Sequence, residues 1–432
     1  MFDRYTLKVN NRGERIQVFL LVALCFYLVL PYAVVSIILG LIVLSSFLLK
    51  MDYTKNRKVL LIQLAFYFIL ALSLFYSENF SFGLAEFKRS IVLLILPFSL
   101  LLFSNSTIKV NFKYMRIAYV LANIGIVLVL FNFFLKGIVA DRLPNLLEEG
   151  FIPQLRYLAS YPYEFVLAKS QKNTSTWFIN HKTLLALNFL LASLFSLQLF
   201  FLDYRQSKLK YFFLFPLLIL IPMIIYTQAL VNIALLSVLF IYVWLNLKKI
   251  SNRIIFSATT IAIAAILVLK FNIVETFNNG NTRSVLALCN GMISGEISEE
   301  ADPRLFIYYC DKELLAKQIV FGYGVGDVQD KLNACYIENN FKSKYKSDRI
   351  FNSHNYFIHL WLAGGVLAML LFIFMLFFNA RLAFTNKDYA YLFFLFFVGV
   401  NLLFDNLFLR FQGALYFALF NSLFLLQNLK AE

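Results

Sequence analysis

Proton transfer near neutral pH is the chemistry that the three histidines of this chain could perform: His181, His354 and His359. His354 lies in the segment Asn352-Ser353-His354-Asn355, directly before a long apolar block, whereas His359 lies inside that block. A histidine at such a boundary can accept a proton or can serve only in packing, and both roles stay open for His354. His359 is expected to face a packed interior.

Arg304 is the cation whose position is most informative. Asp302-Pro303 combines an N-cap residue with a proline at the first helical position, and apolar residues follow at helical spacing. Arg304 is therefore expected in the first turn of a helix, where the helix dipole disfavours a cation unless an anion lies nearby. Helix N-termini and arginine side chains both bind anions, so the sequence predicts an anion site here.

Glycines follow the predicted helix in the run Gly322-Tyr323-Gly324-Val325-Gly326. Such a run can simply end the helix in a turn. It can also bring backbone N–H groups close to an anion, as in other backbone nests. Both interpretations stay open, and Asp327 is expected to cap a second short helix after the run.

Two further groups of basic residues flank apolar blocks. Lys88 and Arg89 stand beside Glu86, and His181 with Lys182 ends the aromatic segment 176–182. Each group either anchors the chain at lipid headgroups or binds an anionic substrate, and the sequence does not choose. The chain contains no P-loop, no zinc motif and no Asp-x-Asp pair of the kind that holds a divalent metal in many sugar transferases.

The elements that must position these residues are membrane-spanning helices. Hydrophobic residues make up 61% of the chain, charged residues only 15%, and the mean hydropathy is +0.73, which excludes an ordinary soluble domain. The apolar residues form blocks long enough to cross a bilayer. We predict an all-α polytopic membrane protein with about twelve transmembrane helices, at 16–30, 32–49, 59–76, 91–103, 117–135, 184–202, 211–226, 229–247, 254–269, 356–378, 390–404 and 411–427. The fourth is the shortest and is expected to extend back through Lys88 and Arg89.

The charges orient these helices. With the N-terminus inside, the inside segments hold 20 basic and 6 acidic residues, a net of +14, and the outside segments hold the remaining 19 and 18, a net of +1. This is the positive-inside pattern, which predicts that both termini are cytoplasmic. Because the inside charges are dispersed in short loops, they favour lipid headgroups rather than nucleic acid as the reason for the basic composition.

Three parts follow from this layout. Residues 1–269 carry the first nine helices with an outside loop near 136–183, residues 270–355 form a large, partly helical periplasmic loop, and residues 356–432 carry the last three helices. Cys289, Cys310 and Cys335 all lie in the large loop, where an oxidising compartment permits one disulfide. The three possible pairings, and three unpaired thiols, all stay open.

The motifs of the last third of the chain resemble those of the O-antigen ligase and O-antigen polymerase superfamily. The resemblance rests on Phe321-Gly322-Tyr323-Gly324-Val325-Gly326, on Ser353-His354-Asn355-Tyr356-Phe357-Ile358 and on Leu362-Ala363-Gly364-Gly365-Val366. Arg304 corresponds to the arginine that precedes the glycine turn in that family. Phe178-Ile179-Asn180-His181 before a span, a basic residue at the position of Arg89, and the layout of about twelve spans also resemble the family.

The resemblance implies a metal-independent glycosyltransferase of the bacterial inner membrane that acts in lipopolysaccharide biosynthesis. Its donor would be a glycan on undecaprenyl diphosphate, and its acceptor a sugar hydroxyl of lipid A–core or of a second lipid-linked repeat unit. His354 and Arg304 would be the catalytic residues, as general base and as leaving-group clamp. The substrate-binding residues would be Lys88, Arg89, His181, Lys182, Arg283, Gly322, Gly324, Gly326 and Asn355.

One departure from the family concerns the outside start of the eighth span. Many members carry a Ser-Arg pair there, whereas this chain reads Tyr226-Thr227-Gln228-Ala229. Lys182, Arg283 or another cation would have to replace the missing arginine, or the substrate differs. A transporter or flippase for an anionic lipid is the main alternative, and a non-catalytic assembly component is a third. Few charges lie inside the spans, which is unfavourable to a transporter.

Overall fold

The computed structural model describes residues 12–48, 57–101, 105–146, 181–227, 229–247, 249–258, 303–341 and 351–429. Within these residues the regular secondary structure is entirely helical, as the composition predicts. The helices up to residue 146 are α1 (Arg12–Leu24), α2 (Tyr32–Leu48), α3 (Arg57–Ser73), η2 (Leu74–Tyr76), α4 (Phe80–Ser90), α5 (Val92–Leu101) and α6 (Asn105–Leu146). Only Ile91 separates α4 from α5, and its own backbone angles are helical, so α4, which carries Lys88 and Arg89, continues almost directly into α5, while their membership of one span stays a prediction.

Most of the remaining helices follow the predicted apolar blocks, and α15 and α16 lie in the predicted large loop. They are α9 (Lys182–Gln198), the π-helical η3 (Leu199–Asp203), η4 (Lys208–Leu214), α10 (Phe215–Tyr226), α11 (Leu230–Asn246), α15 (Pro303–Lys317), α16 (Val328–Glu338), α18 (Tyr356–Thr385), α19 (Tyr389–Phe404), η5 (Leu407–Leu409) and α20 (Phe411–Asn428). The predicted block 254–269 is described only as far as residue 258.

Five helical stretches in the described residues are long and apolar enough to cross a membrane. They are Arg57–Tyr76, Asn111–Asn132, Lys182–Asp203, Lys208–Tyr226 and Tyr356–Thr385. Three shorter apolar helices accompany them, at Tyr32–Ser46, Leu230–Asn246 and Tyr389–Phe404. The membrane-embedded, helical character of the chain is thereby supported, while the count of twelve spans stays a prediction.

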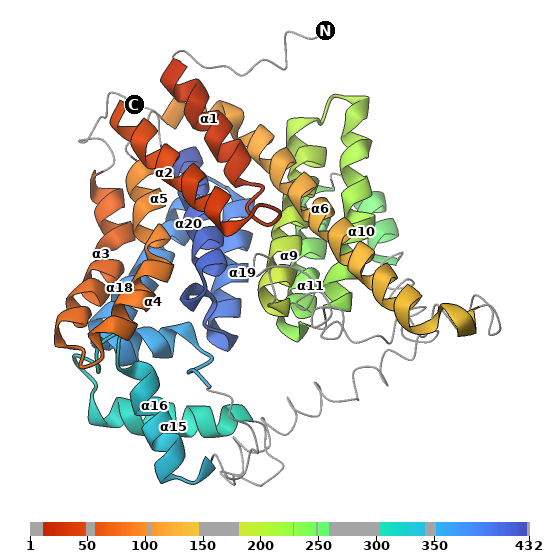
Figure 1. The fold of residues 1–432 in the computed structure, drawn as a ribbon. Coiled ribbons are helices and arrows are strands. Elements are labelled where there is room, and N and C mark those ends of the chain that lie inside the picture. The colour runs from red at the N-terminus through yellow and green to blue at the C-terminus, as the bar shows by residue number, and fades with distance from the viewer. Residues whose placement is uncertain are drawn as a thin grey trace.

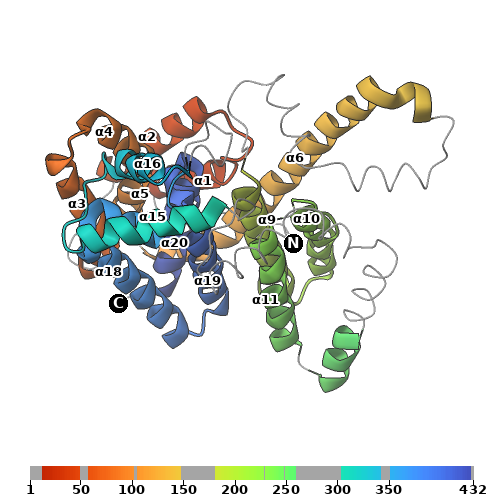
Figure 2. The ribbon, with the colours of Figure 1, turned by 90° about the horizontal axis from the view of Figure 1, so that it is seen from below.

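The spans form two groups, which meet where α6 contacts α1 and α20 and where α9 and α11 contact α19 (Figure 1). One group holds α1 to α5 with α18 to α20, and the other holds α6, α9, α10 and α11. Every residue of α9 from Leu184 to Gln198 is buried, and this helix contacts α6, α10, α11 and α19. The starts of α1 and the end of α20 lie at one end of the bundle, whereas α15 and α16 cover the opposite end beneath α3, α4 and α18 (Figures 1 and 2).

Buried amides connect the helices of the first group. Gln63 of α3 and Asn379 of α18 exchange hydrogen bonds, and both bond to Asn421 of α20, which also accepts from the Tyr391 hydroxyl. Apolar side chains gain little from meeting one another in lipid, so such polar pairs help to hold spans together. This network fixes the positions of α3, α18, α19 and α20 relative to one another.

The α15–α16 unit contains the disulfide that the cysteine count permits. The structure pairs Cys310 with Cys335, and Cys289 lies outside the described residues. The expectation for Asp327 is wrong in one respect. Asp327 precedes α16, but its side chain does not cap that helix. Its carboxylate instead accepts hydrogen bonds from the backbone N–H groups of Glu78 and Asn79, because the loop before α4 lies against it.

Candidate active site at the mouth of α18

Three segments that are far apart in the sequence meet near the start of α18. His181 precedes α9, residues 351–355 precede α18, and residues 405–410 connect α19 to α20. His181 Nε2 lies 3.2 Å from Asp405 Oδ2, and Arg410 Nη1 lies 3.6 Å from Asp405 Oδ1. We call His181, His354, Asp405 and Arg410 the mouth cluster.

Electrostatics keep the His181 imidazole neutral. Burial is the main cause that lowers the pKa of His181 to about 3, and the positive charges of Arg410 and Lys182, with that of His354 when it is protonated, contribute to the same shift. Burial raises the pKa of Asp405, while Arg410 and His354 act in the opposite direction. His181 Nε2 faces Asp405 Oδ2, and a neutral imidazole keeps one nitrogen that can accept a hydrogen bond. The other nitrogen, Nδ1, is buried and has no hydrogen-bond partner among the residues that the structure describes.

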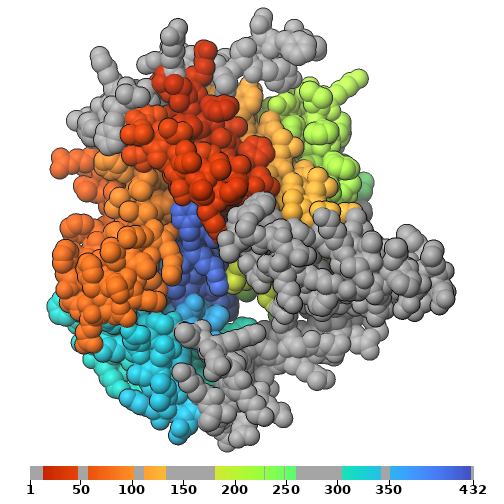
Figure 3. Space-filling model, in the orientation of Figure 1, coloured from red at the N-terminus to blue at the C-terminus, as the bar shows by residue number. Residues whose placement is uncertain are grey.

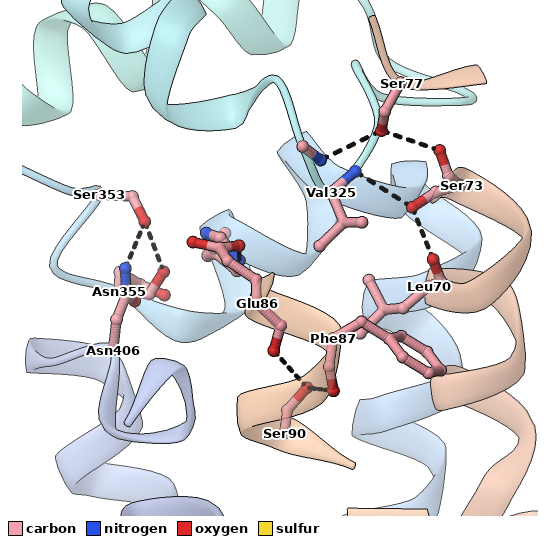
Figure 4. A network of polar contacts seen from close by, with 12 residues as sticks. Leu70, Ser73, Ser77, Glu86, Phe87, Ser90, Val325, Ser353, Asn355 and Asn406 are labelled. Atoms are coloured by element: carbon pink, nitrogen blue, oxygen red, sulfur yellow. Dashed lines mark hydrogen bonds and ion pairs between the residues drawn. The ribbon is translucent and has the colours of Figure 1, made fainter. Parts of the chain in front are cut away.

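His354 adopts a left-handed backbone conformation, with φ of +45°. A residue other than glycine is uncommon there and costs about 1 kcal/mol or more, so its surroundings must hold it. The His354 N–H donates to Asn352 Oδ1, and Ser353 Oγ accepts from Asn406 Nδ2, as Figure 4 shows for the second pair. The connection before α18 is thus fastened to the α19–α20 connection, which brings His354 into the electrostatic range of His181 and Asp405.

Asn355 is the N-cap of α18. Its Oδ1 accepts hydrogen bonds from the backbone N–H groups of Phe357 and Ile358. This oxygen is therefore engaged by the helix, and the binding role expected for Asn355 stays a prediction.

Helix α4 contributes a buried acid beside its cations. Lys88 and Arg89 are exposed in its last turn, whereas the Glu86 side chain is 10% exposed and its Oε2 lies 3.9 Å from His359 Nε2. Burial raises the pKa of Glu86 to about 7, and Arg89 partly opposes the shift. Figure 4 shows Glu86 between the Val325 turn and the Ser353 segment. His359 is buried, as the sequence predicts.

The glycine run is packed against α3, the α3–α4 connection and α18. The N–H groups of Val325 and Gly326 donate to the hydroxyls of Ser73 and Ser77 (Figure 4). A β carbon at Gly326 would lie 2.3 Å from Asn79 O, and one at Gly322 would lie 2.5 Å from Leu362 O. The close-packed turn, one of the two interpretations left open, is what the structure describes. An anion would have to displace these hydroxyls to reach the amides, and substrate binding by Gly322, Gly324 and Gly326 stays a prediction.

The predicted cations are distributed over several elements. Arg304 lies in the first turn of α15, as expected, and is half-buried. Lys182 begins α9 and acts electrostatically on His181. Arg283 and Gln228 lie outside the described residues. The structure thus brings His181, Lys182 and His354 together. Glu86 and Arg89 lie together on α4, and Arg304 lies on α15, which contacts α18.

Sequence reasoning missed Asp405, Arg410 and Glu86 as members of the site. A signal existed for the first two, since a short outside connection between two apolar blocks carries one acid and one base. Charged residues in such a position are uncommon enough to suggest a function. In the described residues, no group of three or more His, Cys, Asp or Glu side chains could hold a metal ion.

A comparison with protein families bears on these positions. Residues 213–373 match the family model described as O-antigen ligase. The matched stretch runs from η4 into α18, and it contains Arg304, the glycine run and His354 but neither His181 nor Asp405. None of the curated proteins matches the chain. The resemblance that the sequence motifs indicate is confirmed by the family match.

Proposed function

We propose that this protein of the O-antigen ligase superfamily transfers a glycan from undecaprenyl diphosphate to an acceptor sugar hydroxyl at the periplasmic face of the bacterial inner membrane. The family match supports a membrane glycosyltransferase of this kind. The observation that carries the proposal is the mouth cluster, because it gathers a neutral imidazole, a second histidine, a carboxylate and an arginine at one end of the spans.

The reaction suits these residues. The acceptor oxygen bonds to the anomeric carbon of the donor glycan, the bond from that carbon to the phosphate oxygen breaks, and the lipid diphosphate leaves with the bonding electrons. The proton of the acceptor hydroxyl passes to a base, for which we propose His354. The diphosphate is already a good leaving group, so cations suffice to hold its charge.

Cations for the diphosphate come from two directions. Arg304 lies at a helix start and can bind two phosphate oxygens at once through its planar guanidinium. Arg89 and Lys88 are exposed at the end of α4. We propose that Arg304 clamps the diphosphate and that the α4 cations hold it at headgroup level.

His181 is the second candidate for the base. Asp405 Oδ2 lies near its Nε2, an arrangement that orients an imidazole and fixes which nitrogen carries the proton. Its Nδ1 is buried and without a partner among the described residues, which favours this role. In either case the proton acceptor belongs to the mouth cluster.

The proposal is tested with the purified protein in lipid nanodiscs. Undecaprenyl-diphosphate-linked glycan is supplied with lipid A–core, or alone, and products are resolved by gel and mass spectrometry. Glycosylated lipid A–core identifies a ligase, and longer lipid-linked glycan without it identifies a polymerase, the alternative within the superfamily. Movement of intact donor across the bilayer with no new glycosidic bond would overturn the proposal in favour of a flippase.

A further inference from the structure

The turn between α15 and α16 lies along the side of α18 rather than above its outer end. Ile319 O accepts hydrogen bonds from the Trp361 indole and from Val366 N–H. Val366 is ten residues beyond Tyr356, where α18 begins. A turn that sat above the membrane would meet the first residues of the span instead.

A break in α18 makes this contact possible. Gly364 and Gly365 leave the helical conformation, and Gly365 has φ of +73° and ψ of −178°. The break frees backbone groups of α18, and the turn uses them, since Tyr323 N–H donates to Leu362 O and Gly324 N–H donates to Ala363 O. A β carbon at Gly365 would lie 1.8 Å from Val320 O, so only glycine admits the turn at this level.

The depth of this contact follows from α3. A β carbon on Gly364 would meet the side chains of Leu70 and Ile69 at 3.4 and 3.5 Å. Leu70 lies six residues before Tyr76, the outer end of the span Arg57–Tyr76, which corresponds to about 9 Å at 1.5 Å per residue. Since 20 helical residues cross about 30 Å, the thickness of the hydrocarbon layer, the turn lies within its outer third.

The side chains of the turn are apolar and exposed. Ile319, Val320 and Phe321 are 52%, 57% and 71% exposed, and Phe75, the neighbour in sequence of Tyr76, is 84% exposed. Phe68 and Leu72 of α3 and Leu367 and Leu370 of α18 are exposed as well. Figure 3 shows the cyan surface of this region directly below the orange surface of α3 and α4. Residues 318–326 carry no charge, although Lys317 and Asp327 flank them.

Several backbone groups of the turn bond to protein partners. Phe321 O accepts from the Tyr76 hydroxyl, and Gln318 N–H donates to Leu314 O. Each such bond lowers the cost of irregular backbone at membrane depth.

We propose that residues 318–322 form a re-entrant turn that inserts into the outer leaflet, with Ile319, Val320 and Phe321 against lipid acyl chains. The prediction that residues 270–355 lie entirely outside the membrane would then be too simple. The turn would also fix the depth of α15, the helix that carries Arg304. The inference does not depend on the proposed function.

The test measures the depth of a nitroxide label on the protein in lipid nanodiscs. Val320→Cys is labelled in a background with Cys25→Ala and Cys289→Ala, where Cys310 and Cys335 are held in their disulfide. Collision rates with oxygen, which concentrates in the bilayer, are compared with those for a water-soluble nickel chelate. Phe321→Cys gives a second reading should the first variant fold poorly.

Two matched positions calibrate the measurement. Phe68→Cys on α3 is 62% exposed and serves as the lipid reference, and Ile337→Cys on α16 is 57% exposed, like Val320, and serves as the aqueous reference. We expect the labels at 320 and 321 to favour oxygen over nickel at least tenfold more than the label at 337. Nickel accessibility equal to that at 337 would overturn the inference. Protection from both reagents would also overturn it, because a protein surface rather than lipid would then cover the turn.

Discussion

The histidines of the mouth cluster and the glycine run both lie in sequence motifs, yet the structure uses their polar groups differently. In the glycine run, the N–H groups of Tyr323, Gly324, Val325 and Gly326 all donate to groups of α3, the α3–α4 connection or α18. In the mouth cluster, His181 Nδ1 has no partner among the described residues, and Asp405 stands between a histidine and an arginine. The glycine run holds the scaffold together, whereas the mouth cluster is the region for which we propose a role in the reaction.

A residue in a sequence motif can therefore serve the fold or the reaction. A glycine that is required because a backbone passes within contact distance supports folding, and its replacement should lower stability first. A histidine whose nitrogen stays available supports a reaction, and its replacement should lower the rate while the fold survives.

The largest effect is expected for the mouth cluster. His354→Asn removes the imidazole but keeps a residue that tolerates the left-handed backbone at this position. Glycan transfer should fall by about 10²- to 10⁴-fold, the contribution of a general base, while the melting temperature stays close to that of the unchanged protein. The measurement is initial transfer rate in nanodiscs beside a thermal scan.

His181→Ala is the matched comparison for that variant. If His354 is the base, His181→Ala should lower the rate less than His354→Asn does. The reverse order would assign the base to His181. Full activity in both variants would show that proton transfer does not involve the mouth cluster.

The next effect concerns the leaving group. Arg304→Lys keeps the positive charge but loses the planar guanidinium that can bind two oxygens at once. Its transfer rate should therefore fall by roughly 10- to 100-fold, almost as far as that of Arg304→Ala. Expression and folding are matched by circular dichroism and by the intact Cys310–Cys335 disulfide. Full rescue by lysine would make Arg304 a membrane anchor, with Arg89, Lys182 and Arg283 then the candidates for the clamp.

The glycine side of the comparison predicts a loss of stability. Gly365→Ala places a β carbon against Val320 O at a residue with positive φ, and it should lower the free energy of unfolding by about 2 to 4 kcal/mol. Gly399→Ala is the control, because nothing lies within 4 Å of its β carbon in α19. Equal melting temperatures for the two variants would contradict the close packing described for the turn.

The smallest effect is a pH dependence at Glu86. Its pKa is raised to about 7 in the folded protein, so the folded state binds this proton more tightly than the unfolded state. Stability should therefore decline as pH rises from about 4.5 to 7, by at most about 3 kcal/mol. Glu86→Gln should remove this part of the decline in thermal scans between pH 5 and 8. An unchanged pH profile would show that Glu86 is not buried in its neutral form.

The sequence by itself determined the helical, membrane-embedded character, the positions of most apolar helices, the helix that carries Arg304 and the resemblance to the O-antigen ligase family. Each depends on local information, because apolar length and helix-start residues are read from neighbouring positions along the chain. The motif before α18 likewise identified His354, although not what surrounds it.

Only the tertiary structure decided which distant groups meet. It paired Cys310 with Cys335, set His181 beside Asp405, directed the Asp327 carboxylate to the loop before α4 and laid the α15–α16 turn against α18. Each contact joins residues whose separation along the chain says nothing about their distance in space. Helix packing fixes that distance, through interlocking side chains and buried amides that no local pattern reveals.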